Sequence, residues 1–147
     1  MAGRTKPELS HLGEGGAARM VDLRAKQDTD REAVAAGDVR IAPEALEPVR
    51  KGKTKKGNVI ETARLAGILA AKRTSDLIPL CHPLAIDAVT IEYEFPKPSC
   101  LRIESEVAVT ARTGVEMEAL VAASITALTV YDMCKSVDRG MVLRDLH

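Results

Sequence analysis

TGVEMEALVAASITALTVYDMCK, residues Thr113 to Lys135, is the longest stretch of the chain with the spacing of a helix. Both of its ends are charged, with Glu116 and Glu118 near the start and Asp132 and Lys135 near the finish. A helix with an apolar surface all round is a buried helix. The residues that make this one apolar on almost every face are Val115, Met117, Leu120, Val121, Ile125, Leu128, Val130 and Tyr131.

The charged ends of this helix are far from each other. At about 1.5 Å per residue, Glu118 and Asp132 are separated by roughly 21 Å. A small substrate can hardly touch both within one chain. Either one end is merely structural, or a neighbouring subunit completes the site.

Two strands are predicted immediately before the helix. Apolar and polar residues alternate over Val89–Phe95 and again over Leu101–Thr110, and the hairpin loop Pro96–Ser99 joins the two runs. One apolar face and one polar face are typical of an antiparallel pair that is open to solvent on one side. Further on, Met141–Leu146 predicts a short final strand.

A second helix is predicted from Asn58 to about Thr74. Asn58 is a favourable cap, and Glu61 completes a capping-box pattern three residues later. The segment Asp76–Leu84 is predicted to be irregular, because Pro79 and Pro83 bracket it. The inward stripe expected for the helix consists of Val59, Ile60, Ala63, Ala66, Leu69 and Ala70.

The first part of the chain has weaker patterns. Met20–Leu23 is expected as a short edge strand, Arg31–Ile41 as a strand interrupted near Gly37, and Pro43–Val49 as one or two helical turns. The resulting order β-α-β-β-α-β predicts an α+β ferredoxin-like sandwich, in which two main helices cover one face of an antiparallel sheet. Residues 1–19 are expected to be a flexible arm and residues 20–147 a single domain.

Composition limits the class of protein. A chain of 147 residues forms one domain with room for a core, and its 2% aromatic content makes that core aliphatic. A formal net charge of zero argues against a protein built mainly to coat nucleic acid or an anionic membrane. Three widely spaced cysteines favour reduced thiols, and the N-terminus lacks an apolar signal core, so we expect a cytoplasmic protein.

A basic stretch precedes the second helix. Five of the seven residues in Arg50–Lys56 are positively charged, and the free amides of a helix start add partial positive charge. One interpretation is a phosphate site built on Lys53, Lys55 and Lys56, and the other is a mobile, solvated loop. Both remain open on the residues alone.

His82 stands between two prolines in the run DLIPLCHPL. A rigidly placed histidine suits proton transfer or anion binding, although a satisfied, partly buried histidine explains the same pattern. Cys81 and His82 lack further ligands at metal spacing, which excludes a zinc site.

The ends of the long helix also have two interpretations each. Glu116 follows Thr113 by three residues, which predicts a capping box, so Glu118 is the better candidate for a substrate contact. Asp132 and Lys135 are either a surface ion pair or an acid–base pair in a site.

Three blocks in their order and spacing, LAGILAAKRTSDLIPLCHPL, GVEMEAL and YDMCK, closely resemble the cyclic pyranopterin monophosphate synthase family of molybdenum cofactor biosynthesis. The resemblance runs from Met20 to Val142. It implies a ferredoxin-like fold and a homohexamer, a trimer of dimers with active sites at subunit interfaces. It also implies a lyase that converts a GTP-derived cyclic triphosphate into cyclic pyranopterin monophosphate and pyrophosphate, without a redox cofactor.

The same resemblance implies site residues. Asp132, Lys56, Lys135 and His82 match positions expected to be catalytic. Asn58 stands where the family's Lys-Gly-Asp motif has aspartate, and the chain ends at His147 where many relatives continue into a Lys- and Gly-rich tail. The positions expected to contact or support the substrate are Leu80, Cys81, His82, Met117, Glu118, Arg31 and Arg73.

A non-catalytic ferredoxin-like domain that binds a nucleotide-like phosphate through Lys51–Lys56 is the alternative from another class. RNA binding is a third interpretation, which the few aromatic residues disfavour.

Overall fold

The structure is a computed structural model that describes residues 9–147. Its centre is a four-stranded antiparallel sheet with the strand order β2-β3-β1-β4. The strands are β1 (Thr29–Arg40), β2 (Ala88–Lys97), β3 (Cys100–Ala111) and β4 (Val142–Arg144).

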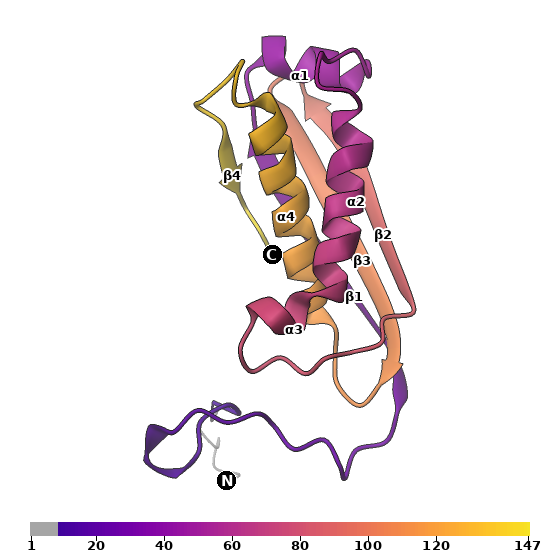
Figure 1. The fold of residues 1–147 in the computed structure, drawn as a ribbon, viewed down its shortest axis with the longest axis vertical. Coiled ribbons are helices and arrows are strands. Elements are labelled where there is room, and N and C mark those ends of the chain that lie inside the picture. Colours follow the sequence, from indigo (N-terminus) through magenta and orange to yellow (C-terminus); the bar gives the residue numbers. More distant parts are fainter. Residues whose placement is uncertain (1–8) are drawn as a thin grey trace, which may run out of the picture.

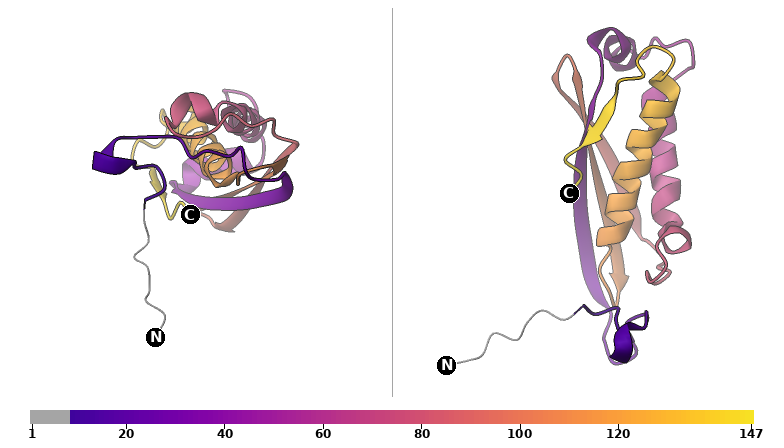
Figure 2. Two further views of the ribbon diagram at one scale, coloured as in Figure 1. Left: turned by 90° about the horizontal axis from the view of Figure 1, so that it is seen from below. Right: turned by 90° about the vertical axis from the view of Figure 1, so that its left-hand side faces the viewer.

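Two helices, α2 (Val59–Lys72) and α4 (Glu116–Cys134), lie side by side on one face of this sheet (Figure 1). The view along the sheet in Figure 2 shows the opposite face without a helix. The short helices are η1 (Glu14–Gly16), α1 (Pro43–Arg50) and α3 (Thr74–Leu77). The predicted ferredoxin-like β-α-β-β-α-β sandwich is confirmed, with α1 and α3 added to it.

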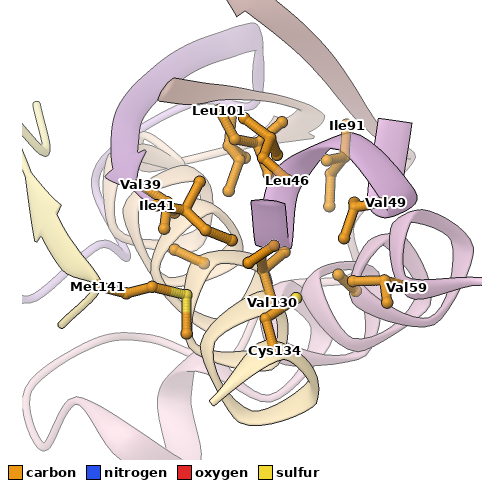
Figure 3. Packing of buried hydrophobic residues seen from close by; sticks show 14 residues of the cluster. Val39, Ile41, Leu46, Val49, Val59, Ile91, Leu101, Val130, Cys134 and Met141 are labelled. Carbon is orange, nitrogen blue, oxygen red and sulfur yellow. The ribbon is translucent and has the colours of Figure 1, made fainter. Parts of the chain in front are cut away.

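The core between helices and sheet is aliphatic, as the composition predicts. Val39, Leu101, Ile103 and Val130 are almost completely buried, and Figure 3 shows strand and helix side chains meeting here. Gly67 lets α2 approach α4 closely, because a Cβ at this position would overlap the Oγ1 of Thr126 and the Cδ1 of Ile91.

The long helix is less buried than its sequence predicts. Val115, Ala122 and Val130 are completely buried, but the Leu128 residue is 50% exposed, so α4 keeps one face at the surface. By length and composition alone α4 could cross a membrane, yet half of that stretch is buried in this fold. Such burial is typical of a core helix.

Several local predictions are wrong. β1 is continuous through Gly37, because it is an inner strand that pairs with β3 along its whole length and with β4 at one end. Met20–Leu23 forms no strand, since no sheet edge lies beside it; its Val21 carbonyl meets a histidine side chain instead. Leu69 of the predicted α2 stripe is 48% exposed, on the side of α2 away from the sheet.

Two boundaries also differ from expectation. α3 includes Asp76 and Leu77, because Pro79 restricts only the residue before it, and Ile78 is indeed extended. β4 ends at Arg144, although the backbone of His147 pairs once more with Ala36. The predicted arm, residues 1–19, includes residues 1–8, which lie outside the described part of the chain, so the domain boundary stays a prediction.

Candidate functional site

Two cavities lie at opposite ends of α4. The first, which we call the histidine pocket, has a volume of about 500 Å³, and the second, the lysine pocket, about 540 Å³. The histidine pocket is lined by His11, Ile78, Pro79, Leu80, Cys81, His82, Leu84, Thr113, Gly114, Glu116, Met117 and Glu118. The lysine pocket is lined by Glu44, Ala45, Pro48, Val49, Lys53, Thr54, Lys55, Lys56, Met133, Cys134, Ser136 and Val137.

The histidine pocket brings together two segments that are far apart in the sequence. Leu80, Cys81 and His82 come from the proline-bracketed loop after α3, and Met117 and Glu118 come from the first turn of α4. All five positions that the resemblance implies as substrate contacts in these two blocks therefore share one cavity.

A buried carboxyl lies in the wall of this pocket. Glu118 is 3% exposed, and its Oε1 accepts a hydrogen bond from the Cys81 thiol at an Sγ–Oε1 distance of 3.6 Å. Burial raises the pKa of Glu118 above its usual range. Burial, with the charge of Glu118 as a smaller cause, raises the pKa of the Cys81 thiol to about 11. Cys81 therefore stays a thiol at neutral pH and donates a hydrogen bond instead of acting as a nucleophile.

His82 is held from outside its own loop. Its Nε2 lies 2.8 Å from the carbonyl oxygen of Val21, which belongs to the N-terminal segment. The same segment contributes His11 to the pocket wall. His11 belongs to the predicted N-terminal arm, residues 1–19, and nothing near it in the sequence indicates that the chain returns to this cavity.

Glu116 does not cap α4, so the predicted Thr113–Glu116 capping box is wrong. The residue at the cap position is Val115, and its side chain makes no hydrogen bond to the helix start. Instead the Glu116 carboxylate lies over Gly114, where a Cβ would overlap it. Gly114 thus leaves room for a carboxylate at the mouth of the histidine pocket, which the pattern Thr-x-x-Glu alone does not reveal.

The lysine pocket forms where the loop before α2 meets the last turn of α4. Gly52 and Gly57 turn this loop with φ values of +66° and +87°, a region that favours glycine. Asn58 then starts α2 by accepting the Glu61 amide at 3.1 Å, as predicted for the cap. The loop thereby presents Lys53, Lys55 and Lys56 together.

An ion pair stands beside the lysine pocket at the end of α4. The Nζ of Lys135 donates to Oδ1 of Asp132 at 2.8 Å, and both side chains are more than half exposed. The hydrogen bond from Lys135 and its charge lower the pKa of Asp132, and the charge of Lys56 adds to this. Asp132 is therefore an ionised acceptor with two lysines close by.

The two predicted arginines lie elsewhere. The Nε of Arg31 donates to the Ala111 carbonyl at 3.3 Å, at the end of the sheet. Arg73 is exposed at the C-terminal end of α2. Neither residue is in the wall of the histidine pocket or of the lysine pocket.

The two pockets offer different chemistry. The histidine pocket combines an imidazole, a thiol and a buried carboxyl among apolar side chains, which suits proton transfer to a small organic molecule. The lysine pocket supplies positive charge for an anion, and the ionised Asp132 lies beside it. The class of protein is therefore a ferredoxin-like α+β chain with two pockets at the ends of one helix, one lined by titratable side chains and one by lysines.

Residues 20–147 match the MoaC family, and the chain belongs to this family. It is 52% identical over 139 residues to the cyclic pyranopterin monophosphate synthase of Desulfitobacterium hafniense, covering 95% of this chain and 85% of that protein. It is 57% identical over 138 residues to cyclic pyranopterin monophosphate synthase 3 of Mycobacterium bovis, covering 94% and 78%. The synthase of Thermomicrobium roseum is 55% identical over 137 residues, covering 92% and 82%.

Proposed function

We propose that the protein is a lyase of molybdenum cofactor biosynthesis. It converts 3′,8-cyclo-7,8-dihydroguanosine triphosphate into cyclic pyranopterin monophosphate and releases pyrophosphate. Membership of the MoaC family and the names of the similar proteins support this reaction. The observation that carries it here is that the residues of the LCHPL and GVEMEAL blocks converge on one pocket.

The roles follow from the residue types in each pocket. His82, Lys56, Lys135 and Asp132 are the acid–base groups for opening and closing rings. Leu80, Cys81, Met117 and Glu118 bind the ring system in the histidine pocket. Departure of pyrophosphate needs positive charge near the developing anion, and the lysine pocket provides it together with Arg31 and Arg73 from other chains of the assembly.

The active form in this proposal is a hexamer, a trimer of dimers, because neither pocket alone holds all these groups. Roughly 21 Å of helix separates Glu118 from Asp132, which is more than one small substrate spans. Exposed apolar side chains are available for subunit contacts: Leu128 of α4 lies with Leu143 and Leu146 around a further cavity beside β4. The protein acts in the cytoplasm.

Pyrophosphate release from the purified cyclic triphosphate tests the reaction. We expect stoichiometric release by the folded oligomer, and no release with intact substrate would contradict the proposal. It would then favour the alternative, a non-catalytic domain that binds a nucleotide-like phosphate at Lys51–Lys56.

Two substitutions test the catalytic assignment. Lys56→Ala and Asp132→Asn should each lower kcat about 10²- to 10⁴-fold, the range for lost acid–base groups, without changing the oligomer's size. Lys51→Ala is the matched control, since Lys51 belongs to the same loop but pairs with Glu47 at 3.0 Å. A near-wild-type rate in Lys56→Ala would remove that lysine from the catalytic groups.

A further inference from the structure

The segment before β1, residues 9–28, runs past the end of the sheet beside the histidine pocket (Figure 1). Residues 11–19 form a small loop: the Arg19 amide donates to the His11 carbonyl at 2.9 Å, and the Gly13 amide donates to the Ala17 carbonyl at 2.8 Å. Gly15 makes the turn with a φ of +73°. His11 and the Met20–Leu23 stretch are thereby held at the same end of the molecule.

One contact fastens this segment to the pocket. Val21 and Leu23 are half-buried, whereas Met20, Asp22 and Arg24 around them are exposed. The carbonyl oxygen of Val21 lies 2.8 Å from Nε2 of His82. Oδ1 of Asp22 accepts the Arg24 amide at 3.0 Å, which orders the chain directly after this carbonyl.

The contact decides which ring nitrogen carries a hydrogen. A carbonyl oxygen only accepts hydrogen bonds, so Nε2 of His82 must donate. In a neutral ring the other nitrogen, Nδ1, then has a lone pair. Within residues 9–147, Nδ1 of His82 has no hydrogen-bond partner.

The backbone of His82 is also restrained. Pro83 follows it directly, and the amide of Cys81, the residue before it, donates to the Ile78 carbonyl at 3.1 Å. With the loop held on one side and Val21 on the other, the ring keeps Nε2 beside the Val21 carbonyl.

We propose that the Val21 carbonyl is a positioning group of the histidine pocket, which holds His82 in the Nε2–H tautomer so that Nδ1 meets the substrate. This inference rests on the proposed function, because it assigns proton exchange with the substrate to Nδ1 of His82. It also gives a role to the Met20–Leu23 stretch, which forms no strand.

Nitrogen NMR of the full chain labelled with ¹⁵N-histidine tests the tautomer directly at alkaline pH, where the rings are neutral. We expect a protonated Nε2 and an unprotonated Nδ1 for His82, assigned by the signals that His82→Gln removes. His147 is an internal reference of the opposite kind, because its Nδ1 lies 2.7 Å from the Asp145 carbonyl. A His82 ring protonated at Nδ1 would overturn the proposal.

A pair of substitutions tests the tether itself. His82→Gln puts an amide group near the position of Nε2, whereas His82→Asn puts it near that of Nδ1. We expect trypsin to cut after Arg19 and Arg24 about 2- to 10-fold faster in His82→Asn than in His82→Gln, as for one lost hydrogen bond. Equal rates, or faster cleavage of the Gln variant, would contradict a tether through Nε2.

His147→Gln and His147→Asn are the matched controls and should not differ in cleavage at these sites. Thermal melting of every variant shows whether it is folded. If His82→Asn does not fold, the NMR result on the unaltered protein still tests the proposal. Pyrophosphate release is measured on the same samples. If the unaltered protein releases none, the proposed function fails, while the tautomer and the cleavage rates still decide the role of Val21.

Discussion

Two carboxyl groups on α4 have opposite electrostatic environments. Burial raises the pKa of Glu118, although the hydrogen bond from the Cys81 thiol partly opposes this, whereas the hydrogen bond from Lys135 lowers the pKa of the exposed Asp132. Two carboxyl groups on one helix therefore have pKa values shifted in opposite directions by their surroundings.

The raised pKa of Glu118 makes stability depend on pH. Between the pKa of an unfolded glutamate, about 4.3, and the higher pKa in the folded state, the folded protein binds more protons than the unfolded chain. The free energy of unfolding contributed by this group is complete below the unfolded pKa and falls as pH rises through the folded pKa. Glu118→Gln carries no such proton, so its unfolding free energy should fall less than that of the unaltered protein.

Denaturant titrations over a series of pH values from about 4 to 9 measure this difference. Glu116→Gln is the matched control, because Glu116 lines the same pocket two residues earlier but is exposed. If the unaltered protein and Glu118→Gln show parallel pH profiles, Glu118 does not hold a proton in this way.

At the scale of elements, the two long helices start differently. The side chain of Asn58 caps α2, whereas α4 starts without a side-chain cap. Asn58→Ala should therefore lower the free energy of unfolding by about 1 kcal/mol. Glu116→Ala should change it by less than about 0.5 kcal/mol, as for an exposed side chain without a structural role. Chemical denaturation of both variants compares them, and an equal loss in both would restore Glu116 as a cap.

The contact between α2 and α4 depends on Gly67. In an exposed helix, replacing glycine by alanine stabilises by about 1 kcal/mol. Here the new Cβ would overlap Thr126 and Ile91, so Gly67→Ala should instead destabilise by about 1 to 3 kcal/mol. The sign of the change in melting temperature decides between the gain in helix propensity and the loss from steric overlap. A gain in stability would show that α2 and α4 can move apart at no cost.

At the scale of the whole molecule, α4 connects two pockets that one substrate cannot reach in a single chain. If each site takes Glu118 from one subunit and Asp132 from another, mixing inactive Glu118→Gln and Asp132→Asn chains should restore activity. Random pairing in equal amounts leaves about a quarter of such two-chain sites intact. Mass spectrometry of differently tagged chains verifies that mixed oligomers form. If these mixed oligomers stay inactive, the sites are not shared between subunits in this way.

The order of the elements and the aliphatic core are predictable from the chain because each depends on local periodicity. The two β runs that precede α4 and the cap at Asn58 are confirmed. The errors occur where a distant partner decides. Gly37 stays in a strand because β3 pairs with it, and the carbonyl of Val21, in the predicted strand Met20–Leu23, lies beside His82 instead of a neighbouring strand.

By itself the sequence determined the fold class, the family and the blocks in which the site residues are expected, because each is a pattern of neighbouring residues. Only the tertiary structure decided which blocks share a cavity. In the fold, Cys81 hydrogen-bonds to Glu118, the Val21 carbonyl lies beside His82, and His11 lines the histidine pocket with them. Burial and hydrogen bonding across long stretches of chain set these contacts and the pKa shifts that follow from them, and no local pattern in the sequence encodes either.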